Sequence, residues 1–140
     1  MTHISSVYKI IKCIENKELT IDEIDSVSIK VTNKCNLNCA MCGYAKNKLL
    51  QNARRDDRPV EAWKVAVDKL SDYGVKTISL LGGEPLLYEG IIEILKYIKQ
   101  KDIHTFITTN GVYLSSFYKD LIELDVTRIN VSLDCFPETH

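Results

Sequence analysis

The sequence predicts an α/β protein in which parallel strands alternate with helices and form part of a (β/α) barrel. Two short segments, at residues 27–31 and 127–133, carry apolar residues at the two-residue period of a β-strand, and residues 76–81 and 104–109 are expected to form two further strands. The segments between them carry apolar residues at helical spacing. This alternation is typical of right-handed βα units around a parallel sheet.

A helix-rich lead-in precedes the first strand. Ile4, Val7, Ile11 and Ile14 recur at helical spacing. We therefore expect residues 1–25 to form a helical lead-in and residues 26–140 to form the core domain.

The first βα unit begins with apolar and polar residues that alternate from Val27 to Val31. The charged segment Lys46–Arg58 is expected to be a solvated loop. Pro59 then suits the first turn of a helix that ends near Gly74. One apolar face of this helix comprises Trp63, Val67 and Leu70.

The second and third units repeat the pattern. The strand Lys76–Leu81 leads to a helix over Tyr88–Gln100, and the strand His104–Thr109 leads to a third helix. The inward side of the second helix is expected to comprise Ile91, Ile92, Leu95 and Ile98. That of the third helix is expected to comprise Leu114, Phe117, Leu121 and Leu124.

The fourth strand, Thr127–Leu133, has two different faces. Ile129, Val131 and Leu133 alternate with Asn130, Ser132 and Asp134. We expect the apolar set to face the helices and the polar set to face the barrel interior. Four strands cannot close a barrel, and an uncovered apolar last strand favours aggregation. The chain is therefore expected to be the N-terminal part of a longer protein.

Composition excludes several classes. The 140 residues suit one domain, and 18 basic against 19 acidic residues give a net charge of −1. This balance gives no indication of a nucleic-acid partner or a membrane-surface partner. The sequence has no apolar run long enough for a membrane span and no secretory signal, so we expect a cytoplasmic protein. In a reducing compartment, clustered cysteines more often serve a metal or catalysis than disulfides.

Unusual short motifs follow each predicted strand. Three cysteines, Cys35, Cys39 and Cys42, follow the first strand, and Gly-Gly-Glu-Pro at 82–85 follows the second. Thr-Asn-Gly at 109–111 and Ser-Leu-Asp at 132–134 follow the third and fourth. In (β/α) barrels the active site forms at the carboxyl ends of the strands. The four motifs therefore indicate one shared functional face.

The cysteine spacing admits three interpretations. Positions 35, 39 and 42 fit one face of a helix, but Asn36, Asn38 and Gly43 are poor residues for a helix interior. A structural zinc site needs a fourth ligand, and the remaining cysteines and histidines are remote in sequence. Three ligands on one loop instead suggest a metal centre with a position left open for substrate or cofactor.

The pattern Cys-x3-Cys-x2-Cys closely resembles that of the radical S-adenosylmethionine (radical SAM) superfamily. Gly-Gly-Glu-Pro is similar to that family's glycine-rich cofactor motif, and the other two motifs occupy similar places. The resemblance extends over about residues 26–140. It implies an α/β fold of the radical SAM type, a partial (β/α) barrel of which about four βα units are present.

The resemblance implies the cofactors and the chemistry. Cys35, Cys39 and Cys42 would each bind one iron of a 4Fe–4S cluster, and the fourth iron would bind S-adenosylmethionine (SAM). Reductive cleavage of SAM would give a 5′-deoxyadenosyl radical that abstracts hydrogen from a substrate, either a peptide or protein or a small molecule. Such an enzyme is oxygen-sensitive and needs an electron donor such as flavodoxin or ferredoxin.

The same resemblance implies the cofactor-binding residues. Gly82, Gly83 and Glu84 would contact the methionine amino group of SAM. Ser132 and Asp134 would reach its ribose or carboxylate, although Asp134 is nearly as well explained as a polar lining residue.

Two further residues would lie near the adenine of SAM. These are Met41 and Tyr44, and each is equally consistent with a core residue. Asn110 is expected to serve the Asn-Gly turn, and Cys13 and Cys135 are expected to bind no metal. Arg54, Arg55 and Arg58 are expected in the solvated loop, with contact to an anionic substrate as the alternative.

The alternative to an enzyme is a truncated, non-catalytic module that binds an iron–sulfur cluster or zinc. Iron and sulfide content distinguishes the two kinds of metal site.

Overall fold

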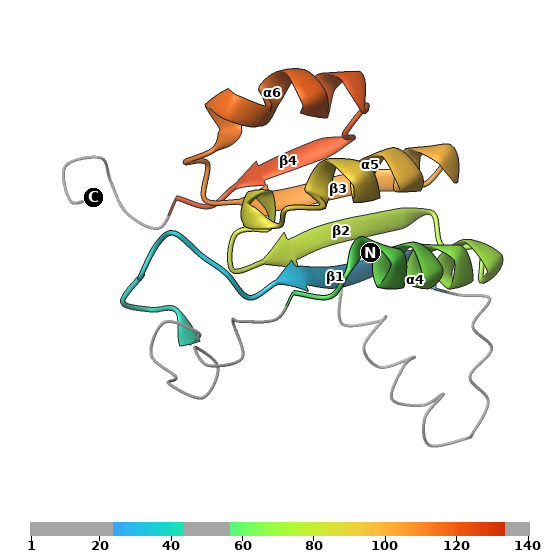
Figure 1. The fold of residues 1–140 in the computed structure, drawn as a ribbon, viewed down its shortest axis with the longest axis horizontal. Helices are drawn as coiled ribbons and strands as arrows, with labels where there is room; N and C mark the ends of the chain where they lie inside the picture. The colour runs from blue at the N-terminus through green and yellow to red at the C-terminus, as the bar shows by residue number, and fades with distance from the viewer. Residues whose placement is uncertain (1–23, 44–56, 134–140) are drawn as a thin grey trace, which may run out of the picture.

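Four parallel strands form one sheet in the order β1–β2–β3–β4 in the computed structural model, which describes residues 24–43 and 57–133 (Figure 1). The strands are β1 (Ser26–Thr32), β2 (Thr77–Gly82), β3 (His104–Thr109) and β4 (Arg128–Val131). Each strand pairs in parallel with the next along the chain. The predicted α/β class with parallel strands is confirmed.

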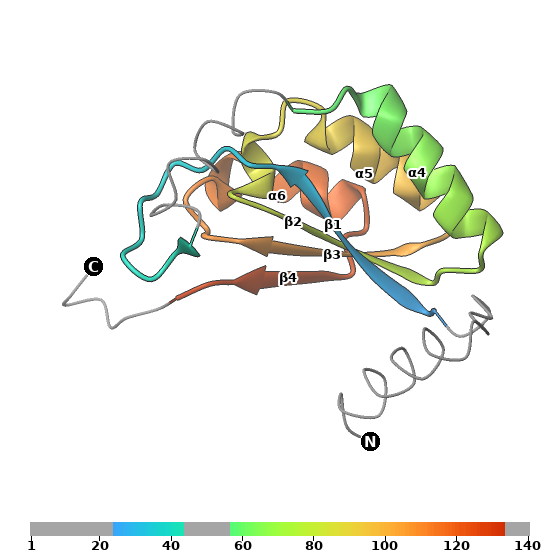
Figure 2. The ribbon, with the colours of Figure 1, turned by 90° about the horizontal axis from the view of Figure 1, so that it is seen from below.

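In the described part of the chain three α-helices lie on one face of this sheet, and the edge-on view in Figure 2 shows this layering. They are α4 (Val60–Asp72), α5 (Ile91–Gln100) and α6 (Leu114–Glu123), and a short 3₁₀ turn, η2 (Pro85–Leu87), precedes α5. Among the described residues, no helix or strand covers the opposite face of the sheet. This one-sided layering is the arrangement of an opened (β/α) barrel, in which the uncovered face corresponds to the interior.

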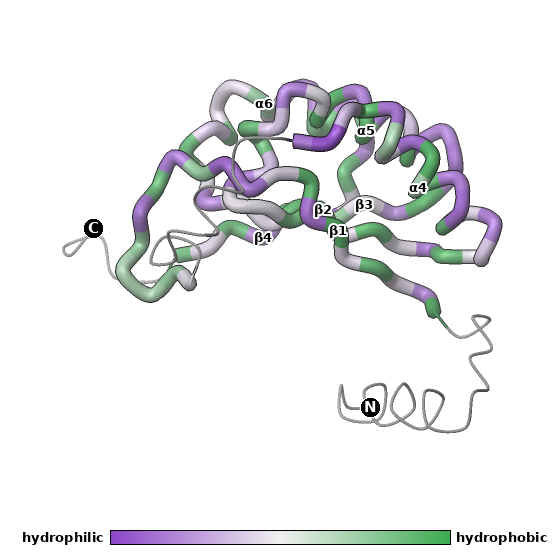
Figure 3. Tube along the Cα trace, turned by 60° about the horizontal axis from the view of Figure 1, so that its bottom comes forward, coloured by the Kyte–Doolittle hydropathy of each residue, from purple (hydrophilic) through white to green (hydrophobic). Residues whose placement is uncertain are grey.

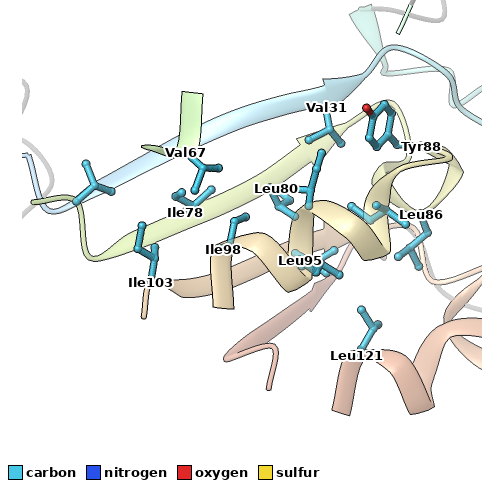
Figure 4. Packing of buried hydrophobic residues seen from close by; sticks show 14 residues of the cluster. Val31, Val67, Ile78, Leu80, Leu86, Tyr88, Leu95, Ile98, Ile103 and Leu121 are labelled. Carbon is cyan, nitrogen blue, oxygen red and sulfur yellow. The ribbon is translucent and has the colours of Figure 1, made fainter. Parts of the chain in front are cut away.

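The core lies between the helices and the sheet (Figure 4). Ile78 and Leu80 of β2 and Ile107 of β3 are fully buried and meet Leu95 and Ile98 of α5. The helices present an apolar face to the sheet because hydrophobic and hydrophilic residues alternate along their turns (Figure 3). Burial of each large aliphatic side chain contributes about 1.5–3 kcal/mol.

All three helices end with the same backbone device. The second residue after each helix has a positive φ: Gly74, Asp102 and Asp125 at +77°, +56° and +56°. The following residue donates its N–H five positions back, as in Val75 N–H to Leu70 O at 3.0 Å. Each helix is thus turned sharply into the next strand, as the sequence predicts at Gly74.

Two element boundaries differ from the predicted ones. Helix α5 begins at Ile91, three residues later than predicted, because Glu84 caps the separate turn η2. Ile94 is fully buried on α5, whereas Ile92 is only partly buried. Strand β4 ends at Val131 and is shorter than predicted.

Strand β4 lies at an edge of the sheet. Ile129 pairs with Ile107, whose side chain is buried under the helices, so the apolar residues of β4 lie on the helix side as predicted. They are incompletely covered, since Ile129 and Val131 remain 39% and 45% exposed.

Several predictions fall outside the described residues. These include most of the helical lead-in at 1–25 and most of the loop at 46–58, so the boundary between lead-in and core stays a prediction. Over residues 24–43 and 57–133, no helix is both long enough and apolar enough to cross a membrane.

Candidate metal and cofactor site

The loops that follow β1, β2 and β3 meet at the carboxyl edge of the sheet (Figure 1). Gly83 donates its N–H to the carbonyl of Thr32 at 3.0 Å, and Glu84 donates its N–H to the carbonyl of Lys34 at 2.7 Å. The backbone of the Gly-Gly-Glu motif is therefore bonded directly to the base of the cysteine loop. This is the shared edge that the motif positions predict.

Gly83 has no room for a side chain. A Cβ at this position would lie 2.3 Å from the Lys34 carbonyl oxygen and 2.8 Å from that of Asn33. At Gly82 a Cβ would lie 3.0 Å from the Thr32 carbonyl oxygen. Sequence reasoning assigned these glycines to close approach of a ligand, and the structure gives a second reason, the close approach of the cysteine loop.

The Glu84 side chain is fully buried and turned into the protein. Its Oε1 accepts hydrogen bonds from Leu86 N–H at 3.1 Å and from the Thr109 hydroxyl at 2.7 Å. Its Oε2 accepts from Asn110 N–H at 2.8 Å. Three donors compensate the burial of the carboxylate and tie the second motif to the third. A contact between Glu84 and SAM stays a prediction, and in this geometry it falls to the backbone.

Asn110 connects the third motif to the cysteine loop. Its Oδ1 accepts from Val112 N–H at 3.0 Å, which is the turn contact that the sequence predicts. Its Nδ2 donates to Asn36 Oδ1 at 2.8 Å and lies 4.0 Å from the sulfur of Cys35. Sequence reasoning missed this second contact, because residues 74 and 75 positions apart carry no mutual signal in a single sequence.

The three cysteines of the loop are partly exposed, and none of these three is in a disulfide. Leu37 N–H points at the Cys35 sulfur at 3.4 Å, and Cys42 N–H donates to the Cys39 carbonyl at 3.0 Å. Among the described residues, no three His, Cys, Asp or Glu side chains converge to hold one metal ion. A cluster that binds each cysteine through a different iron has no need of such convergence, because its ligands surround a larger group.

Asp57 anchors the base of the cysteine loop. The Thr32 hydroxyl donates to Asp57 Oδ1 at 2.6 Å, and Lys34 Nζ lies 2.9 Å from Oδ2. The hydrogen bond to Asp57, and next the negative charge of Asp57, raise the pKa of Lys34.

A pocket of about 400 Å³ lies beside this anchor, at the start of α4, and is lined by Lys34 and Arg58 among others. Burial raises the pKa of Tyr88 in the same pocket, and its hydroxyl donates to the Arg58 carbonyl at 2.7 Å.

The remaining predicted site residues are only partly described. Ser132 follows β4, and its N–H donates to the Thr109 carbonyl at 2.9 Å, which places it at the same edge as the other motifs. Met41 lies in the cysteine loop and is 62% exposed. Tyr44, Asp134 and the arginines at 54 and 55 lie outside the described residues.

Comparison with known proteins gives a family and several relatives. The sequence model of the radical SAM superfamily matches residues 29–140. The chain is 37% identical over 119 residues to a GTP 3′,8-cyclase of Clostridium perfringens, which covers 83% of this chain. It spans only 36% of the length of that relative.

Solved structures share the fold. BtrN in complex with AdoMet and 2-DOIA matches with a TM-score of 0.66 at 22% identity, over 77% of this chain and 45% of that one. SuiB of Streptococcus suis bound to the precursor peptide SuiA matches with a TM-score of 0.63 at 25% identity, over 89% of this chain and 27% of that one. Another structure of SuiB holds S-adenosylmethionine.

Proposed function

Because this chain belongs to the radical SAM superfamily, we propose that it forms the cluster-binding part of a radical SAM enzyme. One observation carries the proposal for these particular residues. The cysteine loop, the Gly-Gly-Glu motif and the Thr-Asn-Gly motif are joined by hydrogen bonds at one edge of the sheet. This bonding supports a single site formed by the three motifs.

The cysteine loop suits an iron–sulfur cluster in its chemistry. Cys35, Cys39 and Cys42 supply three soft donors within eight residues, all partly exposed at the carboxyl edge of the sheet. Three protein ligands leave one iron of a 4Fe–4S cluster available to SAM. When reduced, the cluster supplies the electron that cleaves SAM and so provides a 5′-deoxyadenosyl radical for hydrogen abstraction.

The chain's own residues have binding roles in this proposal. The backbone of Gly82, Gly83 and Glu84 contacts the methionine end of SAM, and Ser132 and Asp134 contact its ribose or carboxylate. The family relation and the position of Ser132 at the shared edge support these roles. The closely packed glycines keep the segment rigid, so that it binds the ligand with little loss of entropy.

The proposal also covers the substrate and the electron donor of the whole protein. The first candidate substrate is the nucleotide GTP, because the relative from Clostridium perfringens is a GTP 3′,8-cyclase. A peptide is the second candidate, since SuiB at 25% identity has been solved with a precursor peptide. The electron donor would be a flavodoxin or a ferredoxin, and the enzyme would be an oxygen-sensitive cytoplasmic protein.

Metal content tests the central claim. The chain reconstituted without oxygen is expected to bind about four irons and four sulfides. Addition of SAM is expected to change the electron paramagnetic resonance (EPR) signal of the reduced cluster. Cys39→Ala should abolish both the iron content and the signal, whereas the matched change Cys135→Ala should preserve them. Zinc without sulfide in freshly purified protein would contradict the proposal and favour the non-catalytic metal-binding module.

GTP and a peptide are distinguished by a second measurement. Release of 5′-deoxyadenosine from SAM by the reduced enzyme should rise when the correct substrate is added. A rise with GTP supports the nucleotide, and no rise in the full-length enzyme contradicts it.

A further inference from the structure

Asn110 makes more contacts than its turn requires. The turn uses only Oδ1, which accepts from Val112 N–H at 3.0 Å. The Nδ2 group points away from the turn, donates to Asn36 Oδ1 at 2.8 Å and lies 4.0 Å from the Cys35 sulfur. An aspartate would complete the same turn but would lack these donors. The turn therefore does not account for the contacts of the amide nitrogen.

The backbone of Asn110 is itself held in place. Its N–H donates to Oε2 of Glu84, and the Glu84 side chain has no exposed surface. The other carboxylate oxygen is held by Leu86 N–H and the Thr109 hydroxyl. A buried carboxylate with three donors has a single orientation, so it fixes the position from which the Asn110 side chain extends.

We propose that Asn110 is a positioning residue that holds the first cysteine of the loop and donates an N–H to its sulfur. The inference deepens the proposed function, on which it rests, because it assigns a residue that tunes the cluster bound through Cys35. Asn36 is the anchor of the contact, and Glu84 is its buried support.

The expected consequence is electrostatic as well as structural. A hydrogen bond to a ligand sulfur favours the more negative, reduced state of an iron–sulfur cluster and so raises its reduction potential. Removal of the Asn110 donor is therefore expected to lower the potential. If Asn110 served only the turn, loss of its N–H donors would not change the reduction potential of the cluster.

The discriminating variant is Asn110→Asp, which retains the turn acceptor and removes both N–H donors. Asn110→Ala removes the donors without adding charge, and it also removes the turn acceptor Oδ1, so Asn110→Asp separates the loss of the donors from the loss of the turn. Asn38→Asp is the matched control, because it adds the same charge at an exposed residue of the cysteine loop, which Asn110 contacts. Circular dichroism should first establish that each variant is folded.

The first readout needs no cluster. Amide hydrogen exchange of segment 33–43 in the apo chain should be roughly two- to tenfold faster in Asn110→Asp and Asn110→Ala than in Asn38→Asp, because one hydrogen bond of ordinary strength is lost. Exchange in β2 should be unaffected. Unchanged exchange in segment 33–43 would overturn the inference.

The second readout is the midpoint potential of the reconstituted cluster, measured by EPR. It should fall in Asn110→Ala, and it should fall further in Asn110→Asp than in Asn38→Asp. A wild-type potential in Asn110→Ala would also overturn the inference. If the wild-type chain binds no cluster, the proposed function fails, and the exchange comparison still decides whether Asn110 positions the loop.

Discussion

Replacement of Gly83 by alanine tests the contact between the second motif and the cysteine loop most directly. The added Cβ would lie 2.3 Å, 2.7 Å and 2.8 Å from three atoms, all of them backbone atoms of Asn33 and Lys34. No side-chain rotation relieves such a clash. The loop must move away, and this movement weakens the 2.7 Å hydrogen bond from Glu84 N–H to the Lys34 carbonyl.

The magnitude follows from two opposing terms. Overpacking typically costs about 1–3 kcal/mol, and a clash confined to backbone atoms belongs at the upper end of that range. Alanine also restricts the unfolded chain, which returns about 0.4–1 kcal/mol. Gly83→Ala is therefore expected to lower the free energy of unfolding by about 2 kcal/mol.

Gly43→Ala is the matched control, because a Cβ there meets nothing within 4 Å. Its effect should be within about 0.5 kcal/mol of zero. Urea unfolding of the 140-residue chain, followed by circular dichroism, measures both variants. If Gly83→Ala costs no more than Gly43→Ala, the close approach of the two loops is refuted.

Three further variants test the core, the buried carboxylate and the helix surface. Leu95→Ala should cost about 2–5 kcal/mol in urea unfolding, because this core residue is 1% exposed. Glu84→Gln should lower the free energy of unfolding by about 1–3 kcal/mol, because both carboxylate oxygens accept backbone N–H groups and an amide has only one oxygen to accept them. Equal urea midpoints for Glu84→Gln and the wild type would contradict this expectation. Hydrogen bonding from Lys101 lowers the pKa of Asp68 in the folded chain. The contribution of Asp68 to the free energy of unfolding is therefore complete above its unfolded-state pKa of about 4, and it is lost as the pH falls through the lowered pKa of the folded state. The stability difference between wild type and Asp68→Asn should therefore shrink below about pH 4, and a constant difference would refute the pairing.

The sequence predicts the layered architecture because each element carries its own periodic signal. Strand β2 alternates buried and half-buried residues from Ile78 onward, and helix α5 buries one apolar stripe. Parallel pairing then places the three described motifs that follow β1, β2 and β3 at one edge without further information. The predicted α/β fold and shared face therefore need only local patterns and general topology.

The hydrogen bonds that join the motifs of the site cannot be predicted from local patterns. A Gly-Gly-Glu motif indicates a tight, ligand-accessible turn, but it does not indicate that the Glu84 carboxylate points inward to Thr109 and Asn110. Nor does an Asn-Gly pair indicate a contact to Asn36, 74 positions earlier in the chain. These partners meet only after the strands have paired.

The hydrogen bonds at the base of the cysteine loop also have a consequence for the order of assembly. Thr32 and Lys34 are bonded to Gly83 and Glu84, which come about fifty residues later. The loop therefore reaches its native conformation only after β2 has paired with β1, a non-local step that is intrinsically slower than local helix formation. The native arrangement of thiols is thus a product of folding, and we expect iron to be loaded onto a preformed scaffold.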